Sequence, residues 1–147
     1  MEDVKTRQAT ENDYEFLYQL HRESLKEFID QTWGWDEEWQ VAYFQDHFDP
    51  SERSIIQFRG MDVGCLSLQR LEDHFFLEYI AILPEFQGKG IGSTLIMEVM
   101  RQASEEDIPV RLRVLRVNPA RALYERLGFH IIEVDNERIY METRTGD

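Results

Sequence analysis

The sequence predicts an α/β protein of the α+β kind, in which a mixed, mostly antiparallel seven-stranded sheet is flanked by about four helices. Two observations lead to this fold class. Strand and helix patterns alternate in the order β-α-α-β-β-β-α-β-α-β-β, and the three central strands are joined by turns short enough for antiparallel hairpins. With 147 residues, 42% of them hydrophobic, and no linker or repeat, the chain is expected to form a single domain over residues 1–147.

The first elements are predicted from capping and periodicity. Val4 to Ala9 has the pattern of a strand. Thr10 followed by Asp13 is typical of a helix N-cap with an acidic third residue, and apolar residues from Tyr14 onward recur at helical spacing. A second helix is expected from Asp36 to about Phe48, because glutamates in its first turn favour the positive end of the helix dipole.

The remaining elements follow from strand patterns and turn residues. Three strands are expected at Ser54–Arg59, Val63–Leu71 and Phe75–Leu83, with hairpin turns at Gly60–Asp62 and Glu72–His74. After a glycine loop we expect a helix with one apolar face that ends before Pro109. We next expect a strand with one polar face at Val110–Val117 and a helix at Pro119–Leu127 that ends at Gly128. Two final strands are expected at Phe129–Val134 and Arg138–Glu142.

Composition excludes several function classes. The formal charge of -13, from 16 Lys plus Arg against 29 Asp plus Glu, argues against nonspecific binding to nucleic acid or to an anionic membrane. The same charge can serve solubility alone. Cys65 is the single cysteine, which favours a reducing cytosol, and its strand context predicts a small core residue. No signal peptide or membrane span is evident, so we expect a cytoplasmic protein, and the four histidines share no metal-ligand spacing.

The stretch LPEFQGKGIGSTLI, residues 83–96, carries the main functional signal. It has neither the GxxxxGK[ST] of a P-loop nor the GxGxxG of a dinucleotide fold. Glycines at 88, 90 and 92 let the backbone approach a ligand, and amides before a helix N-terminus form a nest for a dianion such as a pyrophosphate. The alternative is a tight strand-to-helix turn that needs glycine only for positive φ.

Gln87-Gly88-Lys89-Gly90-Ile91-Gly92 resembles Q/R-x-x-G-x-G/A, the pyrophosphate loop of the GNAT superfamily of acyl-CoA N-acyltransferases. IAILPEFQGKGIG resembles the strand and loop of that family, and NPARALYERLGF, residues 118–129, resembles its next conserved segment. The order of elements also agrees, so the resemblance covers essentially the whole chain. It implies the GNAT fold and transfer of an acetyl group from acetyl-CoA to a primary amine, by direct attack in a ternary complex and without a metal.

The resemblance also implies which residues bind coenzyme A. The loop residues Gln87, Gly88, Lys89, Gly90, Ile91 and Gly92 would contact the pyrophosphate. Ile80, Ala81 and Ile82 would pair through their main chain with the pantetheine arm, as an added strand does. Asn118 matches a coenzyme-contacting asparagine, although it stands six residues before Tyr124 where seven is commoner, and it could be only a helix N-cap.

Two residues are candidates for proton transfer. Glu78 is the one charged residue in FFLEYIAIL, and GNAT enzymes often carry a catalytic glutamate on this strand; the alternative is a solvated strand position. Tyr124 matches the family tyrosine that protonates or hydrogen-bonds the departing sulfur; the alternative is a packed core ring.

The acceptor side is predicted around EFIDQTWGWDEEWQ. Trp33, Trp35, Asp36 and Glu37 combine aromatic faces with carboxylates, which suits the amine of a small molecule or a peptide. The alternative is that Asp36 caps a helix and the tryptophans pack on the sheet. A non-catalytic acyl-CoA-binding or regulatory module of the same fold remains the main rival, a plain scaffold is another, and the sequence leaves a homodimer open.

Overall fold

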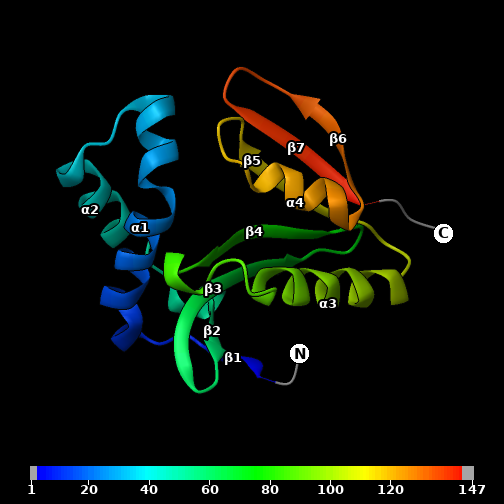
Figure 1. Cartoon of the computed structure of the whole chain (residues 1–147), viewed down its shortest axis with the longest axis horizontal. Coiled ribbons are helices and arrows are strands. Elements are labelled where there is room, and N and C mark those ends of the chain that lie inside the picture. The colour runs from blue at the N-terminus through cyan, green and yellow to red at the C-terminus, as the bar shows by residue number, and fades with distance from the viewer. Residues whose placement is uncertain (1–2, 144–147) are drawn as a thin grey trace. The chain divides into compact units, whose positions relative to one another are not determined.

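The computed structural model describes residues 3–143 and confirms the predicted fold class (Figure 1). Its strands form a 7-stranded sheet in the order β1-β2-β3-β4-β5-β7-β6. The described chain divides into two compact units. Unit 1 contains the residues up to Ser67 together with Tyr79–Ile91, and unit 2 contains Leu68–Glu78 and the residues from Gly92 onward.

Unit 1 holds the N-terminal elements in the predicted order. Its elements are β1 (Val4–Gln8), α1 (Tyr14–Trp33), α2 (Glu37–Asp46), β2 (Ser54–Phe58) and most of β3 (Met61–Arg70), followed by the second half of β4 (Phe75–Ile82). The predicted capping box forms before α1: the Thr10 amide donates to Asp13 Oδ2 at 2.8 Å, and the Asn12 amide donates to Thr10 Oγ1. A short 3-10 turn at Glu11–Asp13 separates this cap from the helix.

The predicted turn between β2 and β3 was placed too late in the chain, by one residue at its start and by two residues at its end. We expected Gly60–Asp62, whereas β2 ends at Phe58 and β3 begins at Met61. Arg59 and Gly60 form the turn with φ of 52° and 82°. Two successive positive φ values define the tight turn whose twist matches that of the flanking strands, so Met61 and Asp62 belong to the ladder.

The core of unit 1 lies between α1, α2 and the strands. Leu17, Leu20 and Ile55 are at most 1% exposed, and Phe44 of α2 packs into the same cluster. Cys65 is 0% exposed in this core, as the sequence predicted, and burial raises the pKa of its thiol. A buried thiol that resists ionisation is a packing residue, which agrees with the absence of a nucleophile in the proposed chemistry.

Unit 2 holds the C-terminal elements, again in the predicted order. They are α3 (Ile91–Glu105), whose first residue belongs to unit 1, β5 (Val110–Leu115), α4 (Ala120–Leu127), β6 (Phe129–Val134) and β7 (Arg138–Thr143). Figure 1 shows β5, β7 and β6 side by side, and both pairings are antiparallel. Gly128 ends α4 at a left-handed φ of 110°, as predicted.

The predicted apolar faces in unit 2 are confirmed. Ile96 and Val99 of α3 are buried while Met97 between them is 51% exposed. In β5, Val110 and Leu112 are buried and Arg113 is exposed, which gives the strand one polar face. Within residues 3–143, no helix is both long enough and apolar enough to cross a membrane.

Candidate functional site

The glycine loop leaves β4 through one 3-10 turn and enters α3 directly. The turn Pro84–Phe86 closes with the Gln87 amide donating to Pro84 O at 3.2 Å. Gly88 and Gly90 then adopt left-handed φ values of 78° and 83°. Ile91, which begins α3, is 2% exposed and anchors the end of the loop. Glycine is therefore required twice, because other residues adopt this conformation only with strain.

The loop amides fall into two groups. The Gln87 amide is already used by the turn, and a contact of Gln87 with the pyrophosphate stays a prediction. Within the described residues, the amides of Gly88 and Lys89 have no hydrogen-bond partner. Both precede the N-terminus of α3, where the first amides of a helix also lack intrahelical acceptors. Such a row of donors at the positive end of a helix can hold an anion.

The Gln87 side chain ties the loop to the preceding strand. Its Nε2 donates to Ile82 O at 2.9 Å, so the side chain turns back toward the end of β4. This contact fixes the direction in which the loop leaves the strand.

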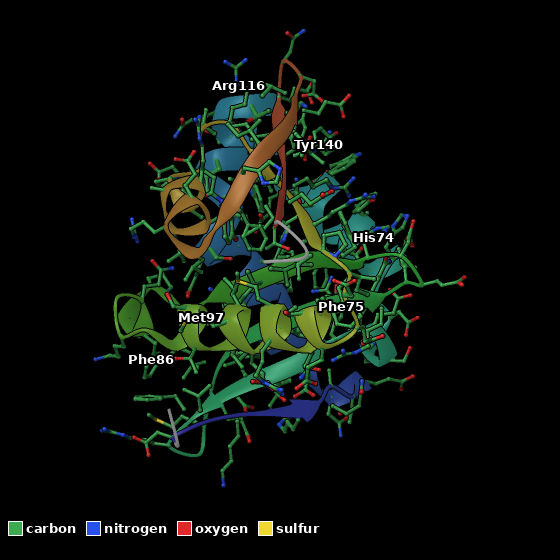
Figure 2. The ribbon with its side chains drawn as sticks, turned by 90° about the vertical axis from the view of Figure 1, so that its right-hand side faces the viewer. His74, Phe75, Phe86, Met97, Arg116 and Tyr140 are labelled. Atoms are coloured by element: carbon green, nitrogen blue, oxygen red, sulfur yellow. The ribbon has the colours of Figure 1, made fainter. Side chains whose placement is uncertain are left out.

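β4 has an incomplete ladder with β5. The parallel register joins Phe75–Leu77 to Val110–Leu112, whereas β4 continues to Ile82 and β5 continues to Leu115. Figure 2 shows His74 and Phe75 at the start of β4, the end at which this ladder forms. Ile80, Ala81 and Ile82 lie outside the ladder. Their backbone groups along that edge are the kind that an extended ligand can pair with.

The other edge of the same β4 segment lies very close to β3. The Leu83 amide donates to Val63 O at 2.8 Å. A Cβ added at Gly64 would lie 2.3 Å from Ala81 O, so any larger residue at this position would force the two backbones apart. Gly64 therefore allows β4 to lie close to β3 in the segment Ile80–Ile82, which is the segment that has no β5 partner on its other edge.

Glu78 lies between the paired and the unpaired part of β4. Its side chain is exposed, and its Oε2 accepts a hydrogen bond from Gln69 Nε2 at 3.2 Å. An exposed carboxylate with one neutral partner is available to accept a proton. Its role as a base stays a prediction.

Tyr124 lies on α4 and is almost fully buried. It is 8% exposed, its ring centroid is 5.9 Å from that of Phe129, and burial raises its pKa to about 12. The phenol therefore keeps its proton at neutral pH, as a general acid requires.

Asn118 caps the beginning of α4. Its Oδ1 accepts a hydrogen bond from the Ala120 amide at 2.9 Å. The N-cap position of α4 itself is Pro119, so Asn118 contacts the first helical amide from one residue further upstream, and its contact with the coenzyme remains a prediction.

The predicted acceptor residues lie together between α1 and α2, but most of their polar groups already have partners. Asp36 caps α2, since its Oδ1 accepts from the Trp39 amide at 3.1 Å. Glu37 accepts hydrogen bonds from Trp35 Nε1 at 2.6 Å and from Arg22 Nε at 3.0 Å. These contacts, that of Trp35 foremost, lower the pKa of Glu37. A cationic acceptor would therefore have to compete with Arg22 for this carboxylate.

The tryptophans differ in how much surface they offer. The face of Trp35 already carries a cation, because Lys26 Nζ lies 5.9 Å from its ring centroid. Trp33, the last residue of α1, is 50% exposed. Of the four predicted acceptor residues, Trp33 offers the most accessible aromatic surface.

The structure also gathers polar residues that sequence reasoning missed. Arg53 lies 5.3 Å from the Phe44 ring and 5.2 Å from the Tyr79 ring. The Tyr79 hydroxyl is buried with the Ser24 side chain close to it, and burial raises the pKa of Tyr79. His21 contacts Gln40 Oε1 at 3.0 Å, and burial lowers its pKa. The alternation of β4, which places Tyr79 on the same face as Ala81, is the one sequence signal for this cluster.

No metal site is evident in the part of the chain that the structure describes. Residues 3–143 contain no group of three or more His, Cys, Asp or Glu side chains placed to hold a metal ion.

A strand edge that loses its partner, followed by a glycine loop and a helix N-terminus, is the arrangement of an acyl-CoA-dependent transferase fold. The chain belongs to the Acetyltransferase (GNAT) family, whose sequence profile matches residues 14–129. It is also 36% identical over 85 residues to a [ribosomal protein bS18]-alanine N-acetyltransferase of Haemophilus influenzae. That alignment spans 57% of this chain and 57% of the relative.

Solved structures share the fold over nearly the full chain. PaiA N-acetyltransferase from Thermoplasma acidophilum, in complex with coenzyme A, matches with a TM-score of 0.77 at 21% identity, covering 96% of this chain and 98% of that chain. The ribosomal-protein-S18-alanine N-acetyltransferase from Escherichia coli matches with a TM-score of 0.66 at 18% identity, covering 98% and 97%. At such identities the likeness establishes the GNAT fold.

Proposed function

We propose that this chain is an N-acetyltransferase that moves an acetyl group from acetyl-CoA to a primary amine within one ternary complex, and that its catalytic unit is a single domain. The observation that carries the proposal is the course of the chain from β4 to α3. A strand edge that lies outside the ladder leads into a loop with left-handed Gly88 and Gly90, and that loop ends at a helix N-terminus.

Acetyl-CoA supplies the activated acetyl group as a thioester. The amides from Gly88 to Gly92, and the positive end of α3, would hold its pyrophosphate. The β4 backbone at Ile80, Ala81 and Ile82 would pair with the pantetheine arm in place of a neighbouring strand. An amide in that segment can also donate to the thioester oxygen as negative charge develops on it.

Two proton transfers complete the reaction. An amine with a pKa of about 10.4 must lose a proton before it attacks, which costs roughly 4 to 5 kcal/mol at pH 7. Glu78, whose carboxylate is exposed, would take that proton directly or through water. The amine nitrogen bonds to the carbonyl carbon and the carbon–sulfur bond breaks; the second N–H proton then passes to the sulfur through the buried Tyr124, which would give its own proton to the sulfur and take up the one released by the nitrogen.

The acceptor is an amine of a small molecule or a peptide. Trp33 would contribute an aromatic face for the approaching ammonium, with Trp35, Asp36 and Glu37 shaping the same wall of unit 1. The Haemophilus relative is a [ribosomal protein bS18]-alanine N-acetyltransferase, so a peptide with an N-terminal alanine belongs in the acceptor panel.

A thiol-release screen tests the proposal. Acetyl-CoA is offered with small amines, polyamines, amino acids and peptides, and the acetylated product is identified by mass spectrometry. We expect at least one amine to raise thiol release clearly above hydrolysis and to gain one acetyl group. Tight acetyl-CoA binding with no turnover across the whole panel would favour the non-catalytic module instead, and no binding would favour a scaffold.

A further inference from the structure

Three aromatic side chains form a continuous stack on the outer face of α2. Trp39 and Tyr43 have ring centroids 5.0 Å apart at an interplanar angle of 14°, and Tyr43 and His47 have centroids 4.0 Å apart at 19°. The residues follow one another at intervals of four, so they lie on one side of the helix. We refer to Trp39, Tyr43 and His47 as the α2 aromatic stack.

The α2 aromatic stack faces solvent, and within α2 only Gln40 and Phe44 are buried. Trp39 is 57% exposed and Tyr43 is 50% exposed, whereas Gln40 and Phe44 are 7% exposed. Side-chain pairs at this spacing stabilise a helix only slightly. Helix stability does not require the largest apolar side chains to lie outside, and large exposed aromatic residues mark binding surfaces.

Acidic residues predominate in the sequence around the stack, and among the described residues the cations that reach α2 are Arg22, paired with Glu37, and Arg53, 5.3 Å from the ring of the buried Phe44. Between Lys26 and Arg53 the chain has no lysine or arginine, and every charged side chain in that stretch is Asp or Glu. Glu38 and Asp46 lie on α2 next to stack residues, and they form no ion pair within residues 3–143. Glu37 is different, because Arg22 already pairs with it.

Flat aromatic faces flanked by carboxylates complement one chemistry above others. A guanidinium is planar, stacks on tryptophan and tyrosine rings, and pairs bidentately with carboxylates. We propose that the α2 aromatic stack, with Glu38 and Asp46, is a docking surface for an arginine-rich polypeptide segment. The occupant is argued from charge and shape complementarity of the exposed face. This surface is distinct from Trp33 and Trp35 of the proposed acceptor site, and its test does not depend on acetyl transfer.

Peptide binding measures the proposal directly. Fluorescence anisotropy follows three labelled probes of equal length: alternating arginine and glycine, alternating lysine and glycine, and alternating glutamate and glycine. We expect the arginine probe to bind more tightly than the lysine probe, and the glutamate probe not to bind. Added salt should weaken binding of both basic probes, because exposed ion pairs are screened.

Substitutions distinguish the contribution of the aromatic stack to peptide binding from that of the overall negative charge. Trp39→Ser and Tyr43→Ser leave every charge in place, and each should weaken the arginine probe about 2- to 5-fold, the loss that corresponds to one exposed stacking contact of about 0.5–1 kcal/mol. Val41→Ser is the matched control, since Val41 is 39% exposed on the same helix outside the stack. Circular dichroism checks that each variant keeps its helices.

Three outcomes would overturn the docking surface. Equal binding of the arginine probe to the original chain and to Trp39→Ser would mean that net charge alone attracts it. Absence of binding at low salt would remove the surface altogether. Self-association that Trp39→Ser abolishes would assign the stack to contacts between copies of the chain instead.

Discussion

Gly88→Ala is the most informative single substitution in the glycine loop. Gly88 has a φ of 78°, and a Cβ added there would meet no atom within 4 Å. The substitution therefore adds backbone strain without a clash. An L-residue in this conformation costs about 1–2 kcal/mol, which for a chain of 147 residues lowers Tm by several degrees.

Gly60 provides a matched control in the same unit. It has a φ of 82° in the β2–β3 turn, and a Cβ there would also meet nothing within 4 Å. Gly60→Ala and Gly88→Ala should therefore lose about the same free energy of unfolding, about 1–2 kcal/mol. Only Gly88→Ala should disturb the amides proposed to hold the pyrophosphate, each of which contributes about 1.5–3 kcal/mol as a hydrogen bond to a charged group.

Calorimetric titration with acetyl-CoA, together with urea unfolding, makes the comparison. We expect Gly88→Ala to bind acetyl-CoA about 10- to 100-fold more weakly, corresponding to the loss of one such hydrogen bond, and Gly60→Ala to bind it normally. Equal affinities for both variants would refute the assignment of the loop to the pyrophosphate. Equal losses in both would mean that strain, rather than the ligand, accounts for the effect.

Three further predictions concern the proposed acid, the proposed base and the N-terminal cap. Tyr124→Phe should lower kcat about 10²-fold with unchanged acetyl-CoA affinity. Because burial raises the pKa of Tyr124 to about 12, this tyrosine ionises at lower pH in the unfolded chain than in the folded one; the original protein should therefore lose about 1.4 kcal/mol of stability per pH unit between pH 10 and about 12, and the variant should not. Glu78→Gln should lower kcat at neutral pH by about 10²-fold or more and change the free energy of unfolding by no more than about 0.5 kcal/mol. Glu133→Gln, also at an exposed strand position, should leave kcat unchanged, and equal rates for the two variants would remove Glu78 from the mechanism. Asp13→Asn should lower the free energy of unfolding, measured with urea at pH 7, by about 1–2 kcal/mol, because the contact of Asp13 with Arg7 lowers the pKa of this carboxyl group. The ion pair stabilises the fold above pH 4 and ceases to do so at lower pH, so a loss that does not depend on pH would contradict its contribution.

The fold could be predicted because its signals are local. The capping box at Thr10, the glycine that ends α4 and the alternation of β5 each depend on neighbouring residues, and each formed as expected. The β2–β3 turn was predicted too late in the chain because both Arg59 and Gly60 take positive φ, and arginine gives no sequence sign of that. The turn between β4 and α3 could be placed from the sequence because two of its residues, Gly88 and Gly90, adopt positive φ, and glycine is the residue that adopts this conformation most readily.

The acceptor side was predicted less well, because partners distant in sequence decide it. Glu37 looked like a free carboxylate in the sequence, yet Arg22 on α1 pairs with it. Trp35 looked like an open ring, yet Lys26 lies over it. Asp36 serves as the cap that its position allowed. Conversely, the sequence of α2 did not allow us to predict that Tyr43 is exposed, because the apolar residues of this helix do not fall on one face.

An NMR titration with acetyl-CoA locates the coenzyme on the chain residue by residue. We expect the largest amide shifts to fall on two segments, the loop amides from Gly88 to Gly92 and the strand amides from Ile80 to Ile82, and both segments to saturate at the same ligand concentration. Saturable binding with shifts confined to other parts of the chain would contradict this expectation.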